Sequence, residues 1–495
     1  MAGIGFELKK MFSKRGLLSI IKAYGYAGIV CTGPMLLGIA LLLGIRVLAE
    51  IAGGTEAEIE LLNCLIQYTL LVSILLSNAL SMVSIRYTAD QMYMERQERV
   101  LPSFWGSVSL MLMLGEPLYG VFLYASEIPF HYIFLCLLFF GELILVWTEI
   151  SYLTAIKDYT GIMVAFVVSL VVALVTGYGL SLVRADIIEA MLIAVCVGYG
   201  MMTVWYYVLL AGYFPKGRCS AMHFLKWMDK YPQLVFIGLF LTAGMFGHIV
   251  IAWTGPLKEQ VYGLLYVAPE YDIPALLAFL STLITTINFV TSVEVNFYSK
   301  YRNYFSLFNE GGSYMDIEQA EREMKTTLVQ ELTYTFTKQF FATIVFIIAG
   351  TLLLPHLPLG MTEDMLGIYR VLCVGYAFYA VGNCAMLIQL YFADNKGALI
   401  SVSVFMVISC VGTWLLRDGS LKYYGVGFFA GSVAFAIVAL VLLYSYLRRL
   451  IFHVLCNQPL VVKEYRGMMT RLAEYFNRRY EKKYHIRYIE DNEVE

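Results

Sequence analysis

Five charged side chains lie inside stretches of this sequence that are otherwise apolar, and they could do chemistry there. They are Glu116, Glu142, Glu149, Glu294 and Arg370. A charge at the centre of a lipid bilayer costs about 2.5–3.5 kcal/mol on insertion scales, so each side chain must face protein or water, or be neutral. In a hydrated cavity, the carboxylates would contact sugar hydroxyls or exchange protons.

Each of these residues also has a structural interpretation. A protonated Glu can bond to a neighbouring helix, and a charged side chain near a span end can reach the membrane interface. Glu116 directly precedes Pro117, and Glu142 and Glu149 lie seven residues apart, which is two turns along one helix face. We weigh both interpretations equally for Glu116 and Glu142. For the three residues closer to the ends of their stretches, the structural interpretation is favoured.

Histidine and tyrosine supply the remaining candidates. His248 could titrate near neutral pH or act as the histidine of a membrane acyltransferase, but a helix–helix contact is the favoured interpretation. Tyr24 and Tyr26 could stack on sugar rings or belong to an interfacial belt. The sequence contains no nucleotide-binding loop, catalytic triad or metal-spaced His/Cys set. It therefore predicts neither an enzyme nor a cofactor or metal site.

The elements that position these residues are membrane spans. Hydrophobic residues make up 59% of the chain, charged residues only 15%, and the mean hydropathy is +0.69. Soluble domains contain about 25% charged residues. Residues 23–45 carry no charge and can cross a hydrocarbon layer of ~30 Å. Gly33 and Pro34 lie near the middle of this span, where proline should kink or open the helix toward protein or water.

Twelve spans are predicted. The first is followed by stretches at about 61–85, 103–125, 131–156, 161–183, 188–210, 233–254, 274–298, 336–355, 367–392, 397–416 and 425–447. With the N-terminus in the cytoplasm, 29 of the 35 Lys and Arg fall in cytoplasmic segments, as the positive-inside rule requires. One missed or extra span would destroy this alternation. Both chain ends are therefore predicted to be cytoplasmic.

A basic connector at 211–232 divides the spans six and six. We predict an interfacial amphipathic segment at 1–22, one six-helix lobe at 23–210, a second at 233–447, and a basic cytoplasmic tail at 448–495. Two such lobes around a central cavity form a common transporter plan. The predicted fold is an all-α integral membrane protein with twelve transmembrane helices in two lobes.

Two cytoplasmic segments carry helical patterns of their own. A helix beginning near Ser313 or Asp316 would place on one face the apolar residues Ile317, Ala320, Met324, Leu328 and Leu332. The tail breaks at Pro459 and continues as a basic, tyrosine-rich helix at 463–484. For this tail we favour a solvated helix held to anionic lipid; a docking site for a cytoplasmic enzyme is the alternative.

Three motifs in the sequence resemble the PelG family. They are the opening Met1-Ala-Gly-Ile-Gly-Phe-Glu-Leu-Lys-Lys10, then Gly25-Tyr-Ala-Gly-x4-Gly-Pro34, and Val293-Glu-x-Asn-Phe-Tyr-x-Lys-Tyr-Arg302 with a later Gly311-Gly-Ser313. The resemblance extends from the N-terminus to about Arg449. It implies an inner-membrane component of Pel exopolysaccharide secretion, related to the polysaccharide flippases of the MOP (MATE-like) superfamily. It supplies no catalytic residues.

The resemblance also implies a function. It implies translocation of an N-acetylhexosamine-rich polymer across a bacterial inner membrane, with a cytoplasmic glycosyltransferase and other Pel membrane proteins as partners and no nucleic acid. We predict a polysaccharide transporter whose path is lined by the Gly33–Pro34 break and by Glu116, Glu142 and Glu149. Further path candidates are Glu294, Arg370, Tyr24 and Tyr26. A lipid-linked oligosaccharide flippase, an ion-coupled small-molecule antiporter and a membrane acyltransferase dependent on His248 stay open as alternatives.

Overall fold

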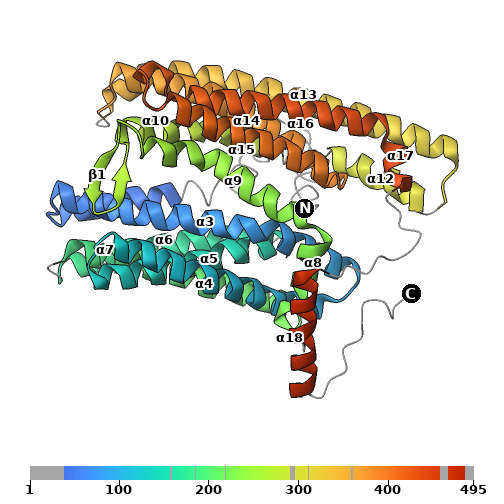
Figure 1. Cartoon of the computed structure of the whole chain (residues 1–495), viewed down its shortest axis with the longest axis horizontal. Coiled ribbons are helices and arrows are strands. Elements are labelled where there is room, and N and C mark those ends of the chain that lie inside the picture. The colour runs from blue at the N-terminus through green and yellow to red at the C-terminus, as the bar shows by residue number, and fades with distance from the viewer. Residues whose placement is uncertain are drawn as a thin grey trace. The chain divides into compact units, whose positions relative to one another are not determined.

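A computed structural model describes residues 38–156, 159–183, 186–217, 219–289, 296–309, 311–357, 360–456 and 467–484. Eleven helices within these ranges are long and apolar enough to cross a membrane. In order, they correspond to the second through twelfth predicted spans. Residues 38–51 are helical and include the end of the first predicted span, whose Gly33–Pro34 break lies outside the described residues. The all-α membrane fold is thus confirmed (Figure 1).

The chain forms two compact units, and we describe each by itself. The described residues of the N-terminal unit fall in 38–242, 260–265 and 467–484. Those of the C-terminal unit fall in 243–259 and 266–456. The last helix among the described residues therefore belongs to the N-terminal unit, although the sequence places it after the final span.

Five long helices build the N-terminal unit: α3 (Glu56–Tyr93), α4 (Val100–Ala125), α5 (Phe130–Ile156), α6 (Tyr159–Ser181) and α7 (Ile187–Tyr213). Between α3 and α4 lies a short 3-10 turn, η1 (Gln97–Arg99). A capping box starts α3, in which Thr55 and Glu58 each accept the other's backbone N–H. α5 packs against α3, α4 and α7, while α6 packs against α7. Packing on three sides therefore positions the side chains of α5.

The basic connector packs onto the same unit. It contains η2 (Ala221–Phe224) and α8 (Leu225–Lys230), which contact α4 and α3 respectively. Gly106 of α4 permits the close approach, since a Cβ there would lie 2.0 Å from the Ala221 carbonyl oxygen. The tail helix predicted at 463–484 is described as α18 (Met468–Tyr484), and it packs against α8 and η2.

The C-terminal unit carries the remaining spans. They are α9 (Pro232–Ala252), which begins in the N-terminal unit, α10 (Pro269–Phe279) with α11 (Leu283–Phe289), α13 (Tyr314–Leu353), α14 (Glu363–Tyr391), α15 (Asn395–Leu416) and α16 (Val426–Arg448). Shorter helices are α12 (Tyr298–Asn309), α17 (Leu450–Cys456), η3 (Leu280–Thr282), η5 (Leu354–His356) and η6 (Leu421–Tyr423). α14 packs against α10, α13, α15 and α16. A two-stranded sheet joins β1 (Glu259–Tyr262) to β2 (Leu265–Val267) between α9 and α10.

The amphipathic pattern near 313–332 forms a helix, but the helix is not a separate element. Ser313 caps α13, which continues unbroken for 40 residues, or about 60 Å. Its apolar face is buried at Met324 and Leu328, and α13 packs against α12. The sequence from 314 to 349 contains neither Gly nor Pro. No helix-breaking residue therefore separates the predicted cytoplasmic helix from the ninth predicted span.

Candidate functional site

The two acidic residues of α5 are enclosed by the N-terminal unit. Glu149 is fully buried, and neither of its carboxylate oxygens has a hydrogen-bond partner among the described residues. Glu142 is half-buried, and its Oε2 is likewise unpartnered there. Seven residues of helix separate the two by about 10 Å along α5. An unpaired buried carboxylate costs free energy when it is charged, so these groups do not explain the stability of the fold.

Glu116 of α4 reaches α5 at the level of Glu142. Its Oε1 lies against Gly141, where a Cβ would come within 3.3 Å of it. A Cβ on Gly200 of α7 would lie 3.1 Å from the Oε1 of Glu142. The two glycines thus leave room for carboxyl groups between α4, α5 and α7. We call Glu142 and Glu149, together with Glu116 of the neighbouring α4, the acidic face of α5.

A hydrogen-bonded polar layer follows about one turn beyond Glu149. The buried Tyr152 hydroxyl lies 3.0 Å from the Ser103 Oγ and 3.5 Å from the Ser107 Oγ. The Ser107 Oγ in turn lies 3.2 Å from the Ser84 Oγ. This layer joins α3, α4 and α5 through partnered groups. Glu149, on the same helix, is buried without such partners among the described residues.

Sequence reasoning missed the polar side of α3. This helix buries hydroxyl residues, mostly at four-residue spacing: Thr69, Ser73, Ser77, Ser84 and Thr88. Such spacing places them along one face. The Thr69 Oγ1 lies 2.8 Å from the Tyr119 hydroxyl, and the Trp147 Nε1 donates to the Ser73 Oγ at 3.2 Å. The regular spacing of small hydroxyl residues in an apolar stretch is the signal that would have identified this face.

Arg370 and His248 make helix contacts within the C-terminal unit. The Arg370 Nε donates to the Thr351 Oγ1 at 3.1 Å, which joins α14 to α13. The buried His248 has its Nδ1 2.7 Å from the Tyr271 hydroxyl, and its ring centre is 4.3 Å from that of Phe428. These contacts are typical of structural residues. The other predicted candidates, Gly33, Pro34, Tyr24, Tyr26 and Glu294, lie outside the described residues.

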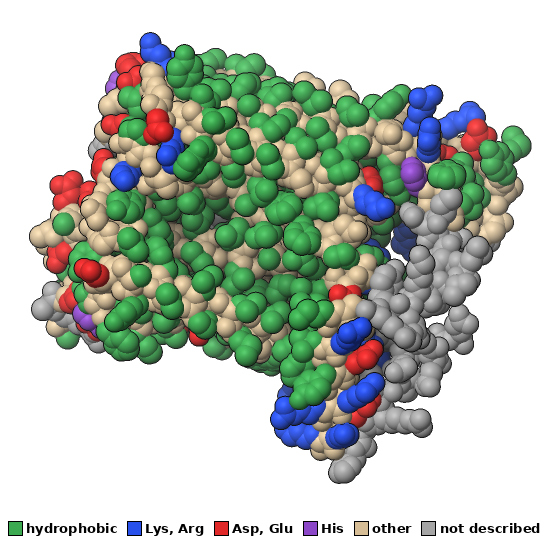
Figure 2. Space-filling view, viewed as in Figure 1, with side chains coloured by type: hydrophobic (Ala, Val, Ile, Leu, Met, Phe, Trp, Pro, Cys, Tyr) green, Lys and Arg blue, Asp and Glu red, His purple; other side chains and the backbone are tan. Residues whose placement is uncertain are grey.

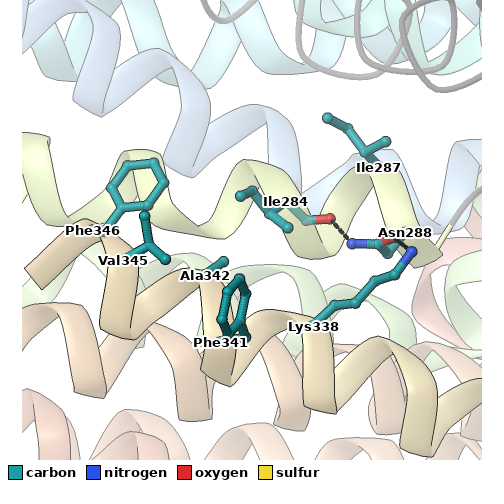
Figure 3. A pocket seen from close by; sticks show the side chains of 8 residues that line it. All are labelled: Ile284, Ile287, Asn288, Lys338, Phe341, Ala342, Val345 and Phe346. Atoms are coloured by element: carbon teal, nitrogen blue, oxygen red, sulfur yellow. Dashed lines mark hydrogen bonds between the residues drawn. The ribbon is translucent and has the colours of Figure 1, made fainter. Parts of the chain in front are cut away.

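In the C-terminal unit, a groove between α11 and α13 is lined in part by the positively charged side chain of Lys338 (Figure 3). Its volume is about 490 Å³, and its lining is formed by Ile284, Ile287, Asn288, Lys338, Phe341, Ala342, Val345 and Phe346. The Lys338 Nζ donates to the Asn288 Oδ1 at 3.0 Å and lies 4.0 Å from the Tyr334 ring centre. The Asn288 Nδ2 donates to the Ile284 carbonyl oxygen at 2.8 Å. We call this the Lys338 groove.

These two regions offer binding chemistry of different kinds. The acidic face presents acceptor atoms with unfilled hydrogen-bonding capacity, which would suit hydroxyl groups or a proton. The Lys338 groove presents one ammonium group against apolar walls, which would suit an anion attached to an apolar chain. Within the described ranges, no group of three or more His, Cys, Asp or Glu is arranged to hold a metal ion.

Comparison with protein families gives one match over nearly the whole sequence. The family is PelG, described as an exopolysaccharide exporter (EPS-E), and its model matches residues 1–455. A comparison with curated proteins finds no match.

Solved structures of MATE transporters share the fold. An outward-facing multidrug resistance MATE transporter of the MOP superfamily aligns with a TM-score of 0.58 and 13% identity, covering 86% of this chain and 96% of its own. The inward-facing form gives a TM-score of 0.55 and 14% identity, covering 87% and 100%. The eukaryotic MATE transporter AtDTX14 gives 0.58 and 12%, covering 92% and 99%. At these identities the likeness establishes the fold alone, which is a MATE-like, all-helical membrane fold.

Proposed function

Because the chain belongs to the PelG exopolysaccharide exporter family, we propose that it carries an N-acetylhexosamine-rich polymer outward across a bacterial inner membrane. The polymer would meet the acidic face of α5 on its way. The observation that carries this proposal is the burial of Glu149, with both carboxylate oxygens unpartnered, in a membrane bundle of MATE-like fold. Evolution retains such costly groups in membranes mainly for function.

The chemistry of the acidic face supports a sugar substrate. Sugar hydroxyls and N-acetyl amides donate hydrogen bonds, and the carboxyl oxygens of Glu142 and Glu149 accept them. Glu116 adds a third acceptor beside Gly141. Three carboxyl groups spaced along one wall can hold successive sugars of a continuous polymer.

Glutamine substitutions test this proposal. Glu116→Gln and Glu142→Gln keep the shape of each side chain but remove its charge, and each should reduce secreted polymer by about tenfold, since a hydrogen bond to a charged group contributes ~1.5–3 kcal/mol. Membrane levels should stay unchanged. Glu318→Gln is the matched control, because this half-buried residue of α13 lies in the C-terminal unit and pairs with Arg322. Unchanged secretion in both path variants would remove them from the path.

A second candidate function is supported by the Lys338 groove. An ammonium group beside apolar walls fits the phosphate and hydrocarbon chain of a lipid-linked oligosaccharide. Under this alternative, deletion of the gene would leave a glycolipid in the inner leaflet, and Lys338→Gln would reproduce that accumulation. Under polymer export, no glycolipid would accumulate in either strain. An analysis of lipid extracts from both strains distinguishes the two functions.

The orientation and partners are part of the same proposal. The bias of Lys and Arg toward alternate segments favours cytoplasmic N- and C-termini. A cytoplasmic glycosyltransferase would then deliver the polymer to the inner side, with other Pel membrane proteins beside it. Reporter fusions at both ends test the topology, because a reporter that is active only outside the cell would have to be inactive at both positions.

A further inference from the structure

The tail helix α18 is fixed to the N-terminal unit along one side. The Asp229 Oδ2 of α8 accepts hydrogen bonds from the backbone N–H of Thr470 at 2.6 Å and from its hydroxyl at 2.7 Å. Asp229 thereby caps the first turn of α18 from a different helix. Thr470 and Ala473 are buried. Gly467 allows this approach, since a Cβ there would lie 2.2 Å from the Asp229 carboxylate.

The opposite side of α18 is apolar and exposed in its first half. Met468, Leu472 and Tyr475 are 80%, 40% and 58% exposed. At about 100° per residue they form one narrow strip along the helix. The strip lines a shallow hollow of about 490 Å³ together with Arg471. Three large apolar side chains aligned on a helix that is already docked on its other side indicate a second contact surface.

The same strip becomes basic in the second half of α18. By the same helical geometry, Arg479 and Lys482 continue the line of Met468 and Tyr475, and Arg478 lies beside it. All three basic side chains are exposed. Figure 2 shows Lys and Arg side chains gathered over this helix. The acidic Glu474 lies to one side of the strip, between it and the docked face. Apolar and basic groups therefore share one face of α18.

The direction of α18 within its unit fits a surface rather than a span. Figure 1 shows that α18 runs across the direction of α3–α7, at the end of the unit where α8 packs, and extends past those helices. A helix that crosses the end of a membrane bundle in this way fits the depth of the lipid headgroups. Helices that rest at that depth bury an apolar strip and place basic side chains on lipid phosphates.

We propose that α18 binds the anionic headgroups of the adjacent lipid leaflet. Met468, Leu472 and Tyr475 enter the interface, while Arg479 and Lys482 contact phosphates. An acidic protein partner would explain the basic half alone, whereas a lipid surface explains both halves of the strip. The proposal concerns how the tail is anchored and does not rest on the identity of the transported substrate.

Hydrogen exchange of the full-length protein tests this proposal. The protein is placed in nanodiscs of neutral phosphatidylcholine or of the same lipid with added phosphatidylglycerol, and exchange is followed at the amides of Met468–Tyr484. Anionic lipid should slow exchange in α18. In the double variant Arg479→Gln/Lys482→Gln, this slowing should be roughly fivefold smaller for each charge removed. High salt should have the same effect as the double variant.

Glu474→Gln is the matched control, because it changes one exposed charge of α18 in the opposite direction. It should increase the protection given by anionic lipid, whereas a substitution that merely loosened the helix would reduce it in both lipids. Equal exchange in neutral and anionic nanodiscs would overturn the proposal. Slowing that requires an added cytoplasmic protein, in either lipid, would overturn it as well.

Discussion

Two buried titratable groups of the C-terminal unit, His248 and Asp272, differ from Glu149 of the N-terminal unit in their hydrogen-bond partners. In the C-terminal unit, His248 lies 2.7 Å from the Tyr271 hydroxyl, and the Asp272 carboxylate accepts hydrogen bonds from Trp253 at 2.9 Å and from the Ala268 backbone N–H at 3.1 Å. In the N-terminal unit, both oxygens of Glu149 are buried without a described partner. Buried groups with hydrogen-bond partners stabilise a fold. A buried carboxylate without partners costs free energy of folding unless another group supplies the missing hydrogen bonds.

The contrast separates structural residues from functional ones within a single chain. A lone charge in a membrane span carries little information by itself, because either interpretation accounts for it. The hydrogen-bond partners of the charged group distinguish the structural interpretation from the functional one. By this criterion the His248–Tyr271 pair belongs to the framework of the C-terminal unit, whereas the unpartnered Glu149 fits the proposed transport path. The acyltransferase interpretation of His248 thus has no support from its surroundings, where the imidazole is packed against Phe428.

The largest effect on polymer secretion is expected at Glu149. Replacing it by leucine removes an unpartnered buried carboxyl group, so Glu149→Leu should raise stability by about 1–3 kcal/mol while reducing polymer secretion at least about tenfold. A higher thermal unfolding temperature in detergent together with loss of secretion would sharpen the contrast. A lower unfolding temperature would show that Glu149 is structural and would break it.

His248→Ala should have the opposite effects: it should lower stability and leave secretion largely unchanged. The substitution leaves a cavity and deprives the buried Tyr271 hydroxyl of a partner, so a stability loss of about 2–4 kcal/mol is expected. Secretion per folded molecule should change little. Thermal unfolding and secretion normalised to membrane level provide the two measurements. Normal stability with abolished secretion would place His248 in the functional class instead.

Tyr152→Phe tests whether a partnered neighbour of Glu149 is structural. The substitution removes the hydroxyl that bonds to Ser103 and Ser107. A stability loss of about 1 kcal/mol is expected, with secretion close to that of the unsubstituted protein. If secretion instead fell as far as in the Glu149 variant, the polar layer would belong to the path together with the acidic face.

The smallest effect is expected at Asp186, which caps α7 outside the spans. Burial raises the pKa of this carboxyl, but hydrogen bonds from Tyr132 and the Glu189 backbone outweigh burial, so the pKa lies below its usual value. Its stabilisation is therefore present at neutral pH and is lost as pH falls through the folded-state pKa.

At neutral pH, Asp186→Ala should cost about 1 kcal/mol as a lost cap. The difference in unfolding temperature from the unsubstituted protein should shrink as the pH is lowered below about 4, where the carboxyl is protonated in both states. A difference that grows on acidification would contradict this assignment. Thermal scans of both proteins across this pH range provide the measurement.

The membrane spans could be predicted closely from the sequence, whereas the surroundings of the candidate site residues could not. Long uncharged stretches and the distribution of Lys and Arg were sufficient to predict the spans, because the membrane imposes length and polarity on each helix. The unbroken α13 was missed because an amphipathic face and a membrane span were treated as separate elements. The partner of His248 comes from another helix, and Glu149 is buried among helices without a described partner, so no spacing along the chain could distinguish the paired group from the unpaired one.

Carbodiimide labelling of carboxyl groups is the most direct test that the acidic face meets the polymer. The full-length protein in nanodiscs is labelled with and without purified polysaccharide, and modification is read by mass spectrometry. The account predicts that the half-buried Glu142 reacts from water and that polymer slows its reaction, while Glu318, which lies outside the acidic face, is unaffected. Carboxyl groups that never react, or that react equally with and without polymer, would contradict it.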